Sequence, residues 1–139
     1  MVTTMNKGSI SRALVLTLLL SMTFIHISSS MISRSLAIAT IFVDPSVTTA
    51  AVGQTFAINI NISSVTNLYG WEIRLKWNST LLNVTNIVEG TFLKQGDSST
   101  FFASKTNNTA GYIIASCTLL GLVPGKNGSG KLATVEFYV

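Results

Sequence analysis

The feature that most constrains the fold of this chain is a two-residue alternation of apolar and polar side chains that recurs after residue 55. Four segments show it, namely 56–62, 71–77, 112–119 and 133–139. Alternation with period two is typical of β-strands that bury one face and expose the other. The side chains predicted to point inward are Phe56, Ile58, Ile60, Ile62, Trp71, Ile73, Leu75, Trp77, Ile113, Ala115, Cys117, Leu119, Ala133, Val135, Phe137 and Val139.

Residues typical of turns separate these segments, and no helical stripe lies between them. The clearest turn signals are at residues 53–54, at 66–67 and in the glycine-rich loop 124–130. Short strands at roughly ten-residue spacing predict an all-β protein, an antiparallel β-sandwich or barrel. A charge placed at Ile60 or Leu75 is expected to unfold such a domain, because its net stability is small.

The first 39 residues have the organisation of an export signal, and we place the folded domain at residues 40–139. Lys7 and Arg12 precede the apolar run 13–27, and small residues follow it. That run is shorter than the ~20 residues with which a helix crosses a bilayer. We therefore expect a hydrophobic signal helix, cleaved between about residues 30 and 39. A retained N-terminal membrane anchor is the alternative.

Five Asn-x-Ser/Thr sequons follow this segment. Such sequons accept N-glycans when they lie on exposed loops of exported chains. Any single sequon can arise by chance here, because Asn, Ser and Thr are abundant. Combined with the export signal, they predict a secreted or cell-surface glycoprotein. The candidate glycosylation sites are Asn61, Asn78, Asn83, Asn107 and Asn127.

The charge of the chain is low and unevenly distributed. Charged residues make up 10% of it, and Lys7, Arg12 and Arg34 all precede residue 40. Residues 40–139 contain six basic and five acidic residues, which gives a net charge of +1 (6 − 5). A nucleic-acid-binding domain needs a basic stripe that survives removal of the leader. None is visible, so we expect no nucleic-acid partner.

Side chains suited to catalysis or metal binding are scarce. With one histidine, His26, and one cysteine, Cys117, the chain lacks the means for Ser-His catalysis outside the leader, for internal disulfides or for a cysteine zinc cluster. Cys117 is interpreted as a small buried hydrophobic residue rather than a reactive thiol. The acids fall in no hydrolase motif, and each is interpreted as a solvated surface residue: Asp44, Glu72, Glu89, Asp97 and Glu136. We predict a protein that is not an enzyme and has no cofactor or metal site.

Four stretches point to a family. A glycine precedes an alternating strand in residues 52–60, and residues 68–84 form a strand that ends in an aromatic turn. Glu-Gly-Thr-Phe-Leu follows at 89–93, and Gly-Ser-Gly-Lys-Leu-Ala-Thr-Val-Glu-Phe at 128–137. In order and spacing they resemble the cohesin domain, a receptor module of extracellular polysaccharide-degrading complexes that is close in fold to some carbohydrate-binding modules. The resemblance implies a jelly-roll-like β-sandwich without catalytic activity.

Two departures from the family pattern accompany this resemblance. Asn78-Ser79 stands where the family usually has Asp-Pro, and it creates a sequon on that turn. The family also continues for about two strands beyond the one at 128–137, and missing strands leave open sheet edges. We therefore expect a domain that is incomplete at its C-terminal end, and that is either marginally stable or recruits another chain to complete its sheet.

The resemblance implies a dockerin-like protein partner and a place where it binds. In cohesins the outward side of the strand at 71–77 contributes to the dockerin-binding face, which corresponds here to Glu72, Arg74 and Lys76. An acid-base-base row can pair with a charged partner and fix its register. The alternative is a solvated strand face whose ion pairs contribute little.

Two other functions remain open from the sequence. A carbohydrate-binding module would stack sugars on Tyr112 and Tyr138, which fall on the polar faces of their strands, whereas Trp71 and Trp77 are expected in the core. The domain could instead be a structural or adhesion segment of a cell-surface glycoprotein. The sequence favours an exported recognition module that takes part in polysaccharide handling. We expect it to contact a membrane only through the N-terminal segment, if that segment is not cleaved.

Overall fold

The structure, a computed structural model, describes residues 38–139. No helix able to cross a membrane occurs among the described residues. The expected signal helix and its cleavage site or anchor involve residues that lie largely outside this range. The described part forms seven strands: β1 (Thr40–Asp44), β2 (Thr55–Leu68), β3 (Gly70–Lys76), β4 (Asn83–Glu89), β5 (Thr100–Asn107), β6 (Tyr112–Leu119) and β7 (Lys126–Tyr138).

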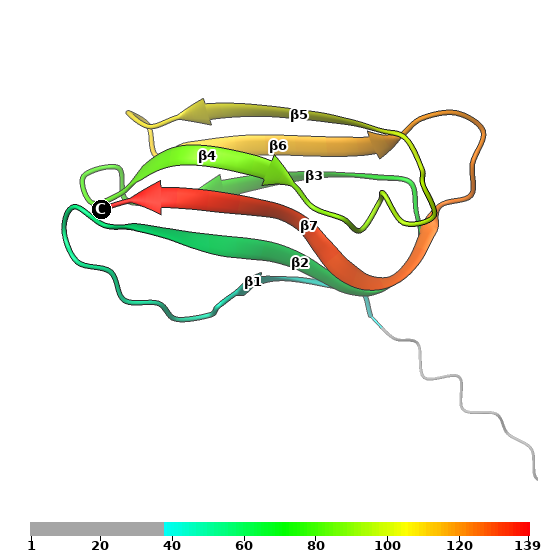
Figure 1. Cartoon of the computed structure of the whole chain (residues 1–139), viewed down its shortest axis with the longest axis horizontal. Helices are drawn as coiled ribbons and strands as arrows, with labels where there is room; N and C mark the ends of the chain where they lie inside the picture. Colours follow the sequence, from blue (N-terminus) through cyan, green and yellow to red (C-terminus); the bar gives the residue numbers. More distant parts are fainter. Residues whose placement is uncertain (1–37) are drawn as a thin grey trace, which may run out of the picture. The chain divides into compact units, whose positions relative to one another are not determined.

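These strands form two sheets that pack face to face (Figure 1). One sheet has the order β1-β2-β7-β4 and the other the order β3-β6-β5. Every neighbouring pair is antiparallel. The prediction of an all-β antiparallel sandwich is therefore confirmed, and the long strands β2 and β7 form the centre of the larger sheet.

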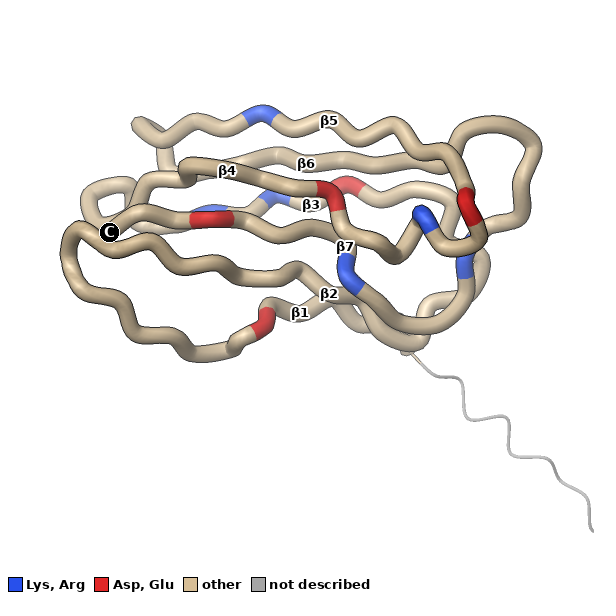
Figure 2. Tube along the Cα trace, in the orientation of Figure 1, with Lys and Arg blue, Asp and Glu red and all other residues tan. Residues whose placement is uncertain are grey.

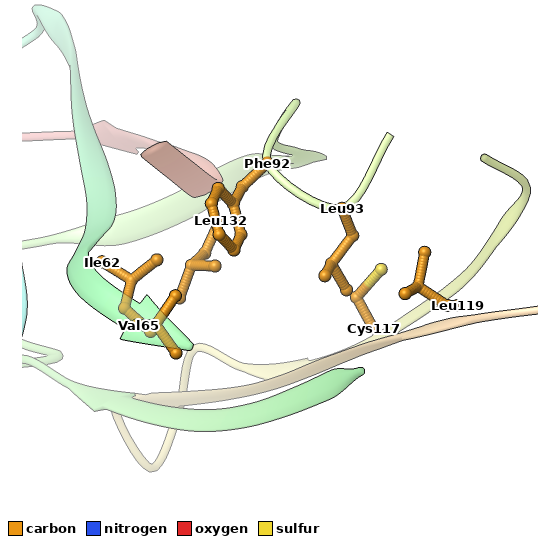
Figure 3. Close-up of a cluster of buried hydrophobic side chains, with 7 residues drawn as sticks. All are labelled: Ile62, Val65, Phe92, Leu93, Cys117, Leu119 and Leu132. Atoms are coloured by element: carbon orange, nitrogen blue, oxygen red, sulfur yellow. The ribbon is translucent and has the colours of Figure 1, made fainter. Parts of the chain in front are cut away.

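The core lies between the two sheets and consists largely of the side chains that the alternation predicts. Ile113, Ala115 and Val135 have no exposed surface, and Cys117 is 3% exposed. Figure 3 shows one of the two core clusters, in which residues of β2 and β7 meet Cys117 and Leu119 of β6. The prediction of a buried Cys117 is confirmed.

A loop between β4 and β5 completes this cluster with two residues that the alternation does not predict. Phe92 and Leu93 are 1% and 2% exposed and reach into the core from the loop (Figure 3). Gly90 brings them there, because its N–H donates to the carbonyl of Leu132 at 2.8 Å. A Cβ atom on Gly90 would lie 2.1 Å from the carbonyl oxygen of Lys131. Only glycine permits so close an approach of the two backbones.

Two predicted turns are instead parts of strands. The structure continues β2 through residues 66–67 and begins β7 at Lys126, inside the predicted loop 124–130. The pairing there is irregular, with register shifts along the end of β2. Side chains replace missing backbone bonds: the N–H of Ser64 donates to Oγ of Ser129, and that of Asn67 to Oδ1 of Asn127. Turn-forming residues therefore mark β-bulges here rather than the ends of strands.

Candidate functional site

The three side chains predicted to bind a partner lie together on one exposed surface. Glu72, Arg74 and Lys76 point outward from β3, while the residues between them are half-buried. β3 is a regular strand paired over its whole length with β6. The sequence alternation therefore positions all three charges on the same side of the β3-β6-β5 sheet.

The strand register extends this surface across the whole sheet. Arg74 lies beside Ile114 of β6, which in turn lies beside Lys105 of β5. Residues paired across a sheet point to the same side, so these three form one row. We call this surface the β3-β6-β5 outer face. Its outward side chains are Glu72, Arg74, Lys76, Phe101, Ala103, Lys105, Asn107, Tyr112, Ile114, Ser116 and Thr118.

The β3-β6-β5 outer face carries the positive charge of the domain. This face carries three basic side chains, Arg74, Lys76 and Lys105, and one acidic side chain, Glu72. Its net charge is therefore +2 (3 − 1). From residue 40 onward the rest of the domain has three bases and four acids, which gives −1 (3 − 4). Figure 2 shows basic positions on β3 and β5 of this layer. The ion pair formed within the described residues, Lys94–Glu89, involves none of the four.

The shape of this face suits contact with another molecule. A shallow depression of about 170 Å³ between β5 and β6 is lined by Ala103, Ser104, Lys105, Ile114 and Ser116. At one end of the sheet Phe101 is 61% exposed. Such a surface combines apolar contacts with flanking charges.

A cation–π contact holds one of the charges in place on this face. The guanidinium carbon of Arg74 lies 4.4 Å from the centre of the Tyr112 ring. A cation over an aromatic face is attracted by the ring quadrupole. This contact orients the Arg74 side chain along the sheet.

The two tyrosines suggested for sugar stacking lie on opposite sides of the domain. Tyr112 is on the β3-β6-β5 outer face, partly under Arg74, whereas Tyr138 points outward from β7 in the other sheet. They therefore share no surface. Trp71 and Trp77 pack against the core, as predicted, and the indole N–H of Trp77 donates to the carbonyl of Leu82.

The five sequons are spread over the domain. Asn78, Asn83 and Asn127 are exposed, while Asn61 and Asn107 are half-buried. Asn107 ends β5 on the β3-β6-β5 outer face, and its Oδ1 accepts a hydrogen bond from the N–H of Ala110. A glycan on Asn107 would border this face.

One acid differs from its sequence interpretation. Glu89 was expected at the solvated surface, but its side chain is only 13% exposed. It ends β4, and its carboxylate accepts hydrogen bonds from Thr100 at 2.6 Å and from the thiol of Cys117 at 3.3 Å. Lys94 lies 2.8 Å away. Because β4 belongs to one sheet and Thr100 and Cys117 to the other, this carboxylate joins the two sheets.

The environment of Glu89 shifts two pKa values. Burial raises the pKa of Glu89, but hydrogen bonds from Lys94, Thr100 and Cys117, together with the charge of Lys94, outweigh burial and leave it below its usual value. Burial and the nearby Glu89 carboxylate raise the pKa of Cys117 to about 12. At neutral pH Cys117 is therefore a protonated hydrogen-bond donor, and no sequence pattern marks this contact.

The described residues define a class of protein. Residues 38–139 hold no group of three or more His, Cys, Asp or Glu side chains that could bind a metal. The β3-β6-β5 outer face combines four charged side chains with a shallow depression lined in part by Ala103 and Ile114. These features are typical of a β-sandwich that recognises another molecule.

Comparison with known proteins identifies the family. The family model of the cohesin domain matches residues 41–139, which is most of the chain. The protein therefore belongs to the cohesin domain family, as the resemblance implied. Cohesin modules are non-catalytic binding domains. No curated protein matches the chain.

Solved structures share the fold at low sequence identity. The second type II cohesin module of the ScaA adaptor scaffoldin from Acetivibrio cellulolyticus has a TM-score of 0.59 at 22% identity, with 76% of this chain and 71% of that chain covered. A type II cohesin–X-dockerin complex from the same organism has a TM-score of 0.57 at 22% identity, covering 72% and 69%. A type I cohesin–dockerin complex from Clostridium thermocellum has a TM-score of 0.57 at 16% identity, covering 73% and 71%. In another structure of the second ScaA module, which includes a long C-terminal linker, this chain covers 63% of the solved chain.

Proposed function

We propose that this cohesin domain is a non-catalytic receptor that binds a dockerin-like protein domain through its β3-β6-β5 outer face. The observation that carries the proposal is the concentration of charge on that face, three bases and one acid, around a shallow apolar depression. The similarity in fold to cohesins solved in complex with dockerins supports the choice of partner.

The charges and the apolar residues have different roles in this binding. Arg74, Lys76 and Lys105 attract an acidic partner surface and set its orientation, because complementary charge steers association and excludes wrong registers. Ile114 and Phe101 supply apolar contacts that exclude water from around the charges. The expected partner therefore presents apolar side chains flanked by acids.

The proposed setting is outside the cell. The N-terminal segment has the organisation of an export signal, and the five sequons suit an exported chain. A receptor module there would hold dockerin-bearing proteins in an assembly that handles polysaccharides at the cell surface or in the medium.

The test is a titration of the full chain with type I and type II dockerin domains, followed by calorimetry. We expect one type to bind, and the double variant Glu72→Arg/Arg74→Glu to weaken that binding at least about tenfold, because the charge pairs that positions 72 and 74 make with the partner become repulsive while Lys76 and Lys105 are unchanged. The control is Glu136→Arg, an exposed glutamate of β7 on the opposite side of the domain.

Two results would overturn the proposal. One is that neither dockerin type binds a folded chain. The other is that the double variant binds like the wild type while Glu136→Arg does not, which would move the site to the other sheet. Binding of a soluble polysaccharide that is lost in Tyr112→Ala, without dockerin binding, would favour a carbohydrate-binding module instead.

A further inference from the structure

Three of the five sequon asparagines lie within the regular register of the strands, and each of them is paired directly with an aromatic side chain. The pairs are Asn61 with Phe42, Asn83 with Tyr138, and Asn107 with Tyr112. Residues paired in this way point to the same side of a sheet, with Cβ atoms about 4.5–5.5 Å apart. An aromatic ring therefore lies within reach of any group attached to these asparagines.

Outward-pointing aromatic side chains are few in the described strands, and most of them belong to these pairs. There are four, namely Phe42, Phe101, Tyr112 and Tyr138. Three of the four have a sequon asparagine opposite them, whereas Phe101 is paired with Thr118. Outward aromatic residues and sequons are thus brought together by strand pairing, in two of the three cases from distant parts of the sequence.

One of the three rings already has another contact. The guanidinium carbon of Arg74 lies 4.4 Å from the centre of the Tyr112 ring. Its partner Asn107 is half-buried and accepts a hydrogen bond at Oδ1 from the N–H of Ala110. This pair on the β3-β6-β5 outer face is therefore a natural comparison for the other two.

The other two rings are accessible and lie on the same surface. Phe42 and Tyr138 are 45% and 44% exposed. They point outward from the β1-β2-β7-β4 sheet, together with Asn61 and Asn83. We call the outward sides of these four strands the β1-β2-β7-β4 outer face. It faces away from the β3-β6-β5 outer face, because the two sheets pack against each other through their inner sides (Figure 1).

The β1-β2-β7-β4 outer face has little charge with which to hydrate its exposed rings. Its charged side chains are Asp44, Lys131 and Glu136. Exposed apolar groups on a protein surface are often covered by a further molecule. A glycan attached to the asparagine opposite each ring would cover the ring and supply hydration.

We propose that Asn61 and Asn83 carry N-linked glycans whose first sugar packs on the opposite ring, and that the β1-β2-β7-β4 outer face is the glycan-covered side of the domain. The C–H groups on one side of a pyranose ring form an apolar surface that fits the face of Phe42 or Tyr138. The proposal rests on the export proposed above and not on dockerin binding.

The attachment is a group transfer from a lipid-linked oligosaccharide. A bond forms between Nδ2 of the asparagine and C1 of the first sugar. The bond between C1 and the phosphate oxygen of the lipid carrier breaks, and the carrier leaves with its electron pair while Nδ2 gives up one proton. The side-chain amide keeps its carbonyl, and the first sugar begins one bond beyond Nδ2.

The first test is site occupancy, measured by glycopeptide mass spectrometry. The full chain is produced in a eukaryotic host that exports and N-glycosylates it, and also in the cytosol of a bacterium that does not. We expect glycans on Asn61 and Asn83 in the exported form. An exported, folded chain with no sugar at either position would overturn the proposal.

The second test asks whether the sugar packs on the ring, and its readout is the melting temperature. Asn83→Gln should lower the melting temperature of the exported form by at least about 2 °C, because the contribution of a cross-strand contact is lost. The same substitution should leave the unglycosylated form unchanged. In a Tyr138→Ser background Asn83→Gln should have no effect in either form. The pair Asn61→Gln and Phe42→Ser should behave in the same way.

The comparison variant is Thr109→Ala, which removes the sequon at Asn107 without altering the asparagine. It should not change the melting temperature of the exported form, because the Tyr112 ring is in contact with Arg74. An equal loss on removing the Asn83 sugar with and without Tyr138 would show that the ring does not hold the sugar, and would overturn the proposed packing. Dockerin titration of the unglycosylated form tests the proposed function separately.

Discussion

At the scale of single residues, Gly90 is a position with little room for change. Its missing Cβ lets the backbone approach Lys131 and directs Phe92 into the core. Gly90→Ala should lower the free energy of unfolding by more than about 2 kcal/mol, because a backbone segment has to move. Urea unfolding measures this.

The matched control for Gly90 is another glycine of the same loop. Gly96 has a φ of 66°, and a Cβ there would meet nothing within 4 Å. Gly96→Ala should therefore cost only the backbone strain of about 1 kcal/mol. Equal losses in the two variants would mean that the contact with Lys131 is not what Gly90 provides.

At the scale of the strands, burial separates two positions that alternation treats alike. Ile60 of β2 is 3% exposed, whereas Leu75 of β3 is half-buried and lines a pocket with Ile41 and Val43. Ile60→Asp buries an unpaired charge at a cost of several kcal/mol, comparable to the roughly 5–15 kcal/mol that holds a domain folded. We expect it to unfold the domain, and Leu75→Asp to lower the melting temperature without unfolding it.

Circular dichroism and thermal melting measure both variants. Asn61→Asp, the adjacent outward position on β2, is the control for introducing an aspartate into that strand. If Leu75→Asp unfolds the chain as completely as Ile60→Asp, the partial exposure of Leu75 does not reduce the cost of a charge at that position.

At the scale of the whole molecule, the Glu89 carboxylate couples the association of the two sheets to pH. Its folded pKa lies below the ordinary value of 4.5, so its contribution is complete above that value and is lost as the pH falls through the folded pKa. The melting temperature of the wild type should therefore fall in acid. Glu89→Gln should melt lower at neutral pH and lose less on acidification.

The comparison variant is Glu136→Gln, whose side chain is exposed on β7. It should follow the wild-type pH profile. Identical profiles for Glu89→Gln and the wild type between about pH 3 and pH 7 would show that the hydrogen bonds from Thr100 and Cys117 do not stabilise the ionised carboxylate.

The sequence by itself determined the inward sides of four strands, β2, β3, β6 and β7, and the buried state of Cys117, because a strand's alternation is a local property of consecutive residues. It did not mark β1, β4 or β5, which alternate less clearly. It also placed Glu72, Arg74 and Lys76 on one side of β3. Only the tertiary structure decided which strands are neighbours.

Strand order brought Lys105 into the row of Arg74, placed Tyr112 and Tyr138 on opposite sides, and set Glu89 against Thr100 and Cys117. Each of these arrangements joins different strands, and their pairing depends on packing of the whole core rather than on any local pattern.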